Sequence, residues 1–258
     1  MNPVQALERY GYAIVPAVVP TSECERMADA LDALEHEQRE AGDRAVRDDE
    51  QVVIYCADVL NPDLFLPYVN QPLVTDVASK VLSTPYVLSS CAGSRSGPKG
   101  GMRPHIDGRI PLRDFADTTH LSAVFCLDDF TQASGAIQFW PMSHTTGSAP
   151  PRGVASDALP GRVDCEAARG SVLFFLGSTW HEVGNNSSGK RRWGLIVTYC
   201  RWWVKPTYDY TKCGPDAYGR LSPAQRALYG FTSKPPGPRE KRHLTLTRAD
   251  DLPDSYPA

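Results

Sequence analysis

The stretch that decides the fold is residues 170–200, GSVLFFLGSTWHEVGNNSSGKRRWGLIVTYC. It opens with the apolar run 171–176, whose length and aromatic and β-branched side chains predict a strand buried on both faces. A turn rich in Gly, Asn and Ser at 184–189 separates this run from a second strand of the same kind at 195–199. Strands of this type indicate the wall of a β-barrel or β-sandwich.

Outward from this stretch, strands dominate the middle of the chain and helices precede them. This order indicates a mainly β, α+β architecture, a barrel or sandwich buttressed by N-terminal helices. We expect one domain, with a helical buttress (1–84), a strand-rich core (85–204) and a C-terminal helix and arm (205–258). The other expected strands are 12–19, 86–92, 120–127 and 136–140. The expected helices are 3–10, 22–35, 72–82 and 222–228. The second of these helices has the spacing of a capping box from Ser22 to Glu25, and a charged loop is expected after it at 35–50.

Composition and charge exclude several classes of partner. The 258 residues carry 27 basic and 30 acidic side chains, which gives a net charge of −3. Nucleic-acid and anionic-membrane partners usually require a strongly basic surface, so we expect neither. The seven cysteines include no CxxC pair, which favours reduced thiols. Without a signal peptide or a long apolar run, the sequence predicts a cytoplasmic protein, and it does not predict the oligomeric state.

Motifs for nucleotide binding and serine-hydrolase chemistry are absent, and the zincin pattern that begins at His181-Glu182 fails at Asn185. What remains is His105-Ile106-Asp107. In an extended strand, residues i and i+2 point to the same face, roughly 7 Å apart. The imidazole and the carboxylate could therefore bind one metal ion, although this short motif also occurs in ordinary surface loops.

His181 is the third candidate ligand, because it follows the apolar strand. We expect a hairpin turning near residue 187 to bring Arg192 almost opposite His181. Two histidines and one carboxylate on one face of Fe(II) leave positions open for a 2-oxo acid and O2. The distal carboxylate of 2-oxoglutarate then needs a planar, permanently charged partner, which arginine supplies. The other histidines lie in polar segments or at strand ends: His36, His120, His144 and His243.

These residues resemble those of the phytanoyl-CoA dioxygenase family of Fe(II)/2-oxoglutarate-dependent oxygenases, and the resemblance covers most of the chain. It implies a double-stranded β-helix, the jelly-roll, cupin-like barrel of that family. The similar segments are Tyr10–Pro16 with the helix after it, His105–Asp107, Leu127-Asp128-Asp129 through Gly135, and Trp140–His144. In the family, the last of these segments usually ends in P-G-S-H. The spacing of His181 from Arg192 is also similar.

The resemblance implies that His105, Asp107 and His181 bind iron and that Arg192 binds the co-substrate 2-oxoglutarate. Thr198 follows Arg192 on the same strand at an even sequence separation, which places both side chains on one face, so Thr198 is a candidate for a second co-substrate contact. With Asp107 as a ligand, the iron has no spare site for a halide. Hydroxylation or a related oxidation by O2, with release of succinate and CO2, is therefore expected rather than halogenation.

The substrate is not identified by the sequence. The sequence has no long basic patch of the kind that a CoA ester would require, so we expect the substrate to be a small metabolite of specialised biosynthesis. Two alternatives stay open: a non-catalytic binding protein on the same fold, and a cupin-like metalloenzyme that uses no 2-oxoglutarate. The candidates for substrate contacts are Arg103, Arg109, Trp140, Trp180 and Trp202.

Overall fold

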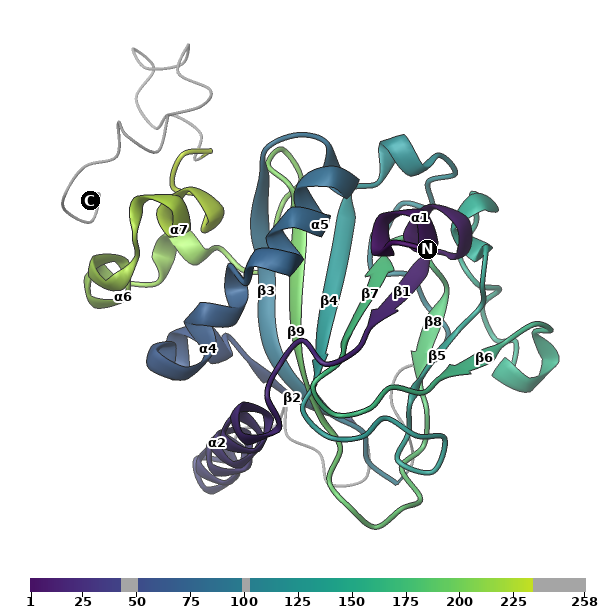
Figure 1. Ribbon diagram of the computed structural model, residues 1–258, viewed down its shortest axis with the longest axis horizontal. Coiled ribbons are helices and arrows are strands. Elements are labelled where there is room, and N and C mark those ends of the chain that lie inside the picture. The colour runs from purple at the N-terminus through teal and green to yellow at the C-terminus, as the bar shows by residue number, and fades with distance from the viewer. Residues whose placement is uncertain (43–50, 99–102, 234–258) are drawn as a thin grey trace.

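Two antiparallel sheets form the centre of the molecule (Figure 1). The computed structural model describes residues 1–42, 51–98 and 103–233. Within these ranges the larger sheet has six strands, in the order β1 (Tyr12–Val15), β7 (Val172–Leu176), β4 (His120–Cys126), β9 (Trp193–Arg201), β3 (Tyr86–Arg95) and β2 (Val52–Tyr55). The smaller sheet has three, in the order β6 (Val163–Cys165), β5 (Ile137–Phe139) and β8 (His181–Val183).

Strand β7 separates two hydrophobic layers. Its Leu173 and Phe175 pack with Phe139 of β5 between the two sheets. Its Val172 and Phe174 belong to the core between the larger sheet and the helices. Because successive side chains of a strand alternate between faces, both sets must be apolar. This two-sided burial accounts for the uninterrupted apolar run in the sequence and confirms it as a buried wall of the fold.

Helices cover the outer face of the larger sheet (Figure 1). Helix α5 (Pro72–Leu82) packs against β3, β4 and β9 and buries Val77 and Val81. The other helices are α1 (Pro3–Tyr10), α2 (Thr21–Glu40), α3 (Ala57–Leu60), α4 (Pro62–Val69), α6 (Pro215–Arg220) and α7 (Pro223–Leu228), with single 3₁₀ turns at Phe115–Asp117, Ser143–Thr145, Ser156–Ala158 and Tyr210–Lys212.

The predicted order of helices before strands is confirmed. Helix α5 has the expected bounds, 72–82, and α7 follows Ser222, whose side chain forms a capping box with Gln225. The expected strands at 86–92, 120–127, 136–140, 171–176 and 195–199 correspond to β3, β4, β5, β7 and β9.

The prediction for the second helix was wrong at both ends. The helix begins at Thr21 after Pro20, and no side chain caps its N-terminus, so the capping box from Ser22 is not formed. It continues past residue 35 to Glu40. Glu35 accepts hydrogen bonds from Arg39 one turn later, at 2.6 and 2.8 Å, and pairs with Arg95 of β3. These contacts stabilise a polar stretch whose composition alone favours a loop.

Strand β1 is shorter than expected, because it ends at Val15 rather than at residue 19. Pro16 has no N–H to donate to a sheet, and Ala17 adopts a positive φ of 55°. Strand β2 and helices α3 and α4 were not predicted.

Parts of two predictions lie outside the described residues, namely the charged loop beyond residue 42 and the C-terminal arm beyond residue 233, which contains His243. Among the described helices, none has the length and apolar character that crossing a membrane requires.

Candidate metal centre

The three predicted ligands come together at the edge of the smaller sheet. His181 opens β8, and His105 lies beside it in an isolated antiparallel bridge, in which each backbone N–H donates to the other carbonyl at 3.0 Å. The expected extended strand at 105–107 is wrong beyond His105. Asp107 lies in a turn, and the N–H of Gly108 that follows donates to the carbonyl of Gly177 at 2.8 Å. This turn, rather than strand alternation, brings the carboxylate to the two imidazoles.

One carboxylate oxygen faces both rings. The Oδ1 atom of Asp107 lies 3.6 Å from the Nε2 of His105 and 3.6 Å from the Nε2 of His181. All three candidate ligand atoms lie within 4.8 Å of one another. Two imidazole nitrogens and one carboxylate oxygen in such a cluster are the donor set of non-haem Fe(II) oxygenases.

Backbone carbonyls fix the tautomer of both histidines. The Nδ1 of His105 donates to the carbonyl of Arg103 at 2.8 Å, and the Nδ1 of His181 donates to that of Thr179 at 3.0 Å. A carbonyl can only accept, so the proton of each neutral ring is on Nδ1 and the Nε2 lone pair is free to bind a metal. The Nε2 of His105 is buried without a hydrogen-bond partner in the described structure, as expected of a metal ligand.

Electrostatics keep two of the three candidate ligands, Asp107 and His181, in the protonation state that binds a metal. Burial alone would raise the pKa of Asp107, but the nearby His181 and His105 and the Ser122 hydroxyl lower it to about 2. Burial lowers the pKa of His181 to about 4, against the opposing effect of Asp107. Burial also acts to lower the pKa of His105, but the contact with Asp107 outweighs it and raises this pKa above 6.5. At neutral pH the cluster therefore contains an ionised carboxylate and a neutral His181.

The second oxygen of Asp107 is held by a residue that sequence reasoning missed. Ser122 of β4 donates from its hydroxyl to Oδ2 of Asp107 at 3.2 Å. The Ser122 hydroxyl is 3.0 Å from the hydroxyl of Thr198 on β9. Thr198, predicted as a co-substrate contact, is thus linked through Ser122 to Asp107, one of the three candidate metal ligands. In the sequence, Ser122 is marked only by its place in the expected strand at 120–127.

The expected hairpin between His181 and Arg192 is wrong. Strand β8 pairs with β5 in the smaller sheet, whereas β9, which begins directly after Arg192, pairs with β3 and β4 in the larger one. The intervening turn passes from one sheet to the other. A polar turn between two apolar segments favours a hairpin locally, but the sheet to which each strand belongs depends on distant partners.

Arg192 is nevertheless a buried cation without a carboxylate partner. Its side chain is 2% exposed, and among the described residues it forms no ion pair. Its Nη2 donates to the carbonyl of Gly135 at 2.7 Å, and its guanidinium carbon lies 4.3 Å from the ring centre of Phe130. Burial lowers its pKa to about 10, so it remains charged at neutral pH. The charge of Asp128 opposes this lowering of the pKa, but among the described residues no carboxylate lies within ion-pair distance of the guanidinium, so a bound anion would stabilise the buried charge.

The five candidate substrate residues are not brought to one place. Arg103 lines a cavity of about 660 Å³ together with Glu182 and Val183, the two residues that follow His181. His181 itself does not line this cavity. Arg109 is exposed and has a positive φ of 55°. The indole nitrogens of Trp140 and Trp180 donate to the carbonyls of Leu159 and Ser148, and Trp202 lines two other cavities, which contain none of the three metal ligands.

Solved proteins of similar fold include SnoN and HygX, and each has a structure with 2-oxoglutarate bound. The non-haem α-ketoglutarate-dependent epimerase SnoN from nogalamycin biosynthesis has a TM-score of 0.60 and 22% identity, over 77% of this chain and 82% of SnoN. HygX from Streptomyces hygroscopicus, solved with nickel, 2-oxoglutarate and hygromycin B, has a TM-score of 0.64 and 15% identity, over 79% of this chain and 88% of HygX. These likenesses confirm the cupin-like fold of 2-oxoglutarate oxygenases.

Two sequence relatives are uncharacterised proteins, Mb1539 of Mycobacterium bovis and Rv1501 of Mycobacterium tuberculosis. Each is 33% identical over 116 residues, which are 44% of this chain and 41% of the relative. The chain therefore spans only about two fifths of the length of these relatives.

The sequence profile of a known family covers most of the chain. The profile described as phytanoyl-CoA dioxygenase (PhyH) matches residues 7–194. The matched segment contains the three clustered candidate ligands and Arg192, and the strands of both sheets lie within it or begin in it. The chain belongs to the phytanoyl-CoA dioxygenase family.

Proposed function

We propose that this protein is a dioxygenase that hydroxylates, or otherwise oxidises, an unactivated C–H bond of a small metabolite. The family to which it belongs uses Fe(II), 2-oxoglutarate and O2. The observation that carries the proposal is that one protein contains both the cluster of His105, Asp107 and His181 and a buried arginine, Arg192, which forms no ion pair among the described residues. Succinate and CO2 are the expected co-products.

Each of these residues has a distinct role in the proposal. His105, Asp107 and His181 hold the iron through the two Nε2 atoms and a carboxylate oxygen. Iron and 2-oxoglutarate, when bound, would supply the oxidising chemistry with O2 as the oxidant, while the protein determines which C–H bond is presented. Arg192 binds the distal carboxylate of 2-oxoglutarate, and this anion compensates the charge of the guanidinium. We expect the apolar layer between the sheets to limit the access of water to the reacting groups, because its Phe139 and Phe175 rings lie 6.0 and 4.5 Å from the ring of His181.

The substrate is proposed to be a small metabolite of specialised biosynthesis. Two structural neighbours support this class, because SnoN belongs to nogalamycin biosynthesis and HygX was solved with hygromycin B. SnoN is an epimerase, so epimerisation is an alternative outcome of the same chemistry. A cytoplasmic location remains a prediction from the sequence.

The first test needs no substrate. Fe(II) and then 2-oxoglutarate are added anaerobically to the metal-free protein, and the weak visible charge-transfer band of the chelate is recorded. We expect the band in the wild type and its absence in His181→Ala. In Arg192→Ala the 2-oxoglutarate concentration for half-maximal band intensity should rise at least about tenfold, because a charge-assisted contact of about 1.5–3 kcal/mol is lost.

Two other outcomes would contradict the proposal. If folded wild-type protein binds iron but gives no band, a cupin-like metalloenzyme without 2-oxoglutarate becomes the better assignment. If the folded protein does not bind iron, a non-catalytic binding protein on this fold becomes the better assignment. If the band forms, a substrate screen that measures succinate release follows.

A further inference from the structure

The backbone next to Arg192 is anchored by a carboxylate from another loop. The backbone N–H of Trp193 donates to Oδ2 of Asp128 at 2.9 Å. In return, the N–H groups of Leu127 and Asp128 donate to the carbonyl of Trp193 at 3.1 and 3.3 Å. Arg192 therefore directly precedes a residue whose N–H and C=O are both bound to the same two-residue segment.

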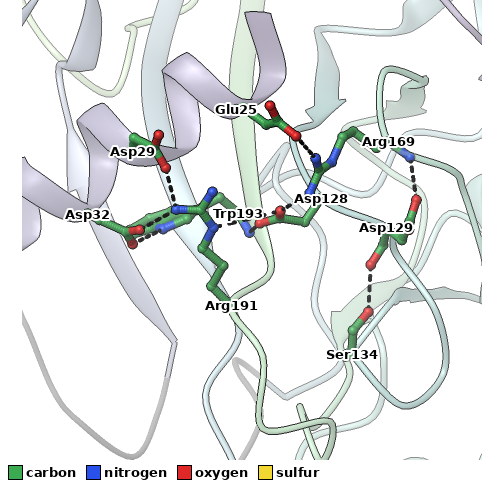
Figure 2. Close-up of polar contacts among 9 residues, drawn as sticks. All are labelled: Glu25, Asp29, Asp32, Asp128, Asp129, Ser134, Arg169, Arg191 and Trp193. Carbon is green, nitrogen blue, oxygen red and sulfur yellow. Dashed lines mark hydrogen bonds and ion pairs between the residues drawn. The ribbon is translucent and has the colours of Figure 1, made fainter. Parts of the chain in front are cut away.

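The other oxygen of Asp128 is occupied by arginines (Figure 2). Oδ1 accepts from Nη2 of Arg169 at 3.0 Å and lies 3.9 Å from Nε of Arg191. Asp128 is 6% exposed, so these contacts are formed largely out of water. One buried carboxylate thus contacts the residues on both sides of Arg192.

The carbonyls that hold the guanidinium belong to the same loop. Arg192 donates to the carbonyls of Ser134 and Gly135, at 3.4 and 2.7 Å. The Ser134 hydroxyl donates to the carbonyl of Asp129 at 2.8 Å, and a carboxylate oxygen of Asp129 accepts the N–H of Arg169 at 2.8 Å. The loop therefore carries Asp128 at one end and the two carbonyl acceptors at the other, with Arg169 bound to its first part.

Helix α2 completes the anchor from the opposite side, as Figure 2 shows. Arg191 donates to Asp29 at 2.7 Å and to Asp32 at 2.5 Å, and the indole nitrogen of Trp193 donates to Asp32 at 2.7 Å. Each neighbour of Arg192 is thereby bound to the helix as well as to Asp128. The guanidinium of Arg192 is buried, and the carbonyls of Ser134 and Gly135 attach it to this network.

We propose that Asp128 is a positioning residue, which sets the place of the Arg192 guanidinium and hence the protein's selectivity for 2-oxo acids with a distal carboxylate. The inference rests on the proposed function. A bidentate contact between a guanidinium and a carboxylate tolerates little displacement, and a misplacement of about 1 Å can reduce a rate by about 100-fold. Loss of the Asp128 contacts frees the Trp193 N–H and the loop that supplies the carbonyls, so the guanidinium shifts.

The test compares two 2-oxo acids that share the metal-chelating end. Pyruvate lacks the distal carboxylate, so its affinity does not depend on Arg192. Affinities of 2-oxoglutarate and pyruvate are measured anaerobically on the iron-loaded protein from the chelate band. In Asp128→Ala we expect the preference for 2-oxoglutarate to fall about tenfold or more, with iron and pyruvate affinities unchanged. Asp128→Asn keeps the side-chain volume and one acceptor, so it should give an intermediate loss.

The outcomes separate the two proposals. If the wild type shows no preference for 2-oxoglutarate over pyruvate, the proposed function fails. If the wild type has the preference and folded Asp128→Ala and Asp128→Asn retain it, or lose both affinities equally, the positioning role is overturned and the function stands. Should Asp128→Ala not fold, Asp128→Asn alone decides.

Glu35→Gln is the matched control. This carboxylate is 7% exposed and also pairs with two arginines, Arg39 and Arg95, but it makes no hydrogen bond to Trp193 or to Arg191. It should lose stability while keeping the wild-type preference for 2-oxoglutarate.

Discussion

The hydroxyl of Ser122 determines how Asp107 presents its carboxylate. Oδ1 faces the two imidazoles, while Oδ2 accepts from Ser122, which is fully buried and paired with Thr198. Because Oδ2 already has a partner, Asp107 offers a metal one oxygen rather than two. Hydrogen bonds from behind a ligand orient it before the metal arrives and limit the ways in which it can rotate.

Ser122→Ala should lower the affinity for Fe(II) about tenfold, since loss of an outer partner of a metal ligand typically costs 10–100-fold. An anaerobic Fe(II) titration of the metal-free protein measures this. The control is Ser89→Ala on β3, which removes a hydroxyl that is 1% exposed and lies 3.1 Å from the hydroxyl of Thr207. Equal iron affinity for Ser122→Ala and the wild type would show that Asp107 is oriented without this bond.

The candidate ligands could be nominated from the sequence, but the groups that support them could not. The H-x-D motif and a histidine directly after a buried strand suffice to nominate His105, Asp107 and His181. The Ser122 contact requires knowing that the chain turns at Asp107 and that β4 lies beneath it, which are properties of the folded chain. The same holds for the carbonyls that fix the histidine tautomers.

At the scale of elements, α2 approaches β3 because that strand has a glycine at the contact. A Cβ placed on Gly93 would overlap the side chain of Leu31, with Cδ1 at 2.8 Å and Cγ at 3.0 Å. Leu31 is fully buried. The close approach matters to the site, because α2 also carries Asp29 and Asp32, which hold the neighbours of Arg192.

Gly93→Ala should destabilise the protein by about 1–3 kcal/mol, the usual cost of adding volume to a packed core. Leu31→Ala alone should cost about 2–5 kcal/mol by leaving a cavity. Since the added methyl fills part of that cavity, the double variant should cost less than the sum of the two. Denaturant unfolding measures all three, with Gly219→Ala on α6 as control, because a Cβ at Gly219 meets nothing within 4 Å. Strict additivity would contradict the proposed contact.

Elements with a strong local pattern were predicted, and those defined by pairing were not. Helix α5 and strand β7 each carry a continuous local signal, periodic in one and apolar throughout in the other. Strands β2 and β8 are four and three residues long and exist through their partners. For the same reason the sequence predicted a hairpin at 181–192 where the structure crosses between sheets.

Over the whole molecule, the N-terminal and C-terminal helices meet on the outer side of the larger sheet. Tyr229, just after α7, donates a hydrogen bond to Oδ2 of Asp58 in α3, and Arg220 of α6 donates to Asp63 of α4 at 3.1 Å. Asp58 is buried, and this burial raises its pKa to about 6, although the Tyr229 hydroxyl opposes the shift. The contact therefore makes the attachment of the C-terminal helices sensitive to pH.

The sign of this dependence follows from linkage. The unfolded pKa of an aspartate is about 3.9. The native state holds the proton more tightly, so the stabilising contribution is complete below about pH 4 and is lost as the pH rises through the native pKa of about 6. A shift of about two units corresponds to about 3 kcal/mol. The free energy of unfolding of the wild type, relative to that of Asp58→Asn, should therefore fall by about 2 kcal/mol between pH 4 and pH 7, because pH 4 is already close to the unfolded pKa.

Denaturant unfolding at several pH values measures this difference, and the comparison with Asp58→Asn cancels every other titrating group. Asp63→Asn is the control, because Asp63 is an exposed carboxylate that also joins an N-terminal helix to a C-terminal one. Its curve should run parallel to that of the wild type. A wild type that gains stability over Asp58→Asn as the pH rises would mean that Tyr229 stabilises the ionised carboxylate by more than burial penalises it, and that the helices are joined most strongly above neutral pH.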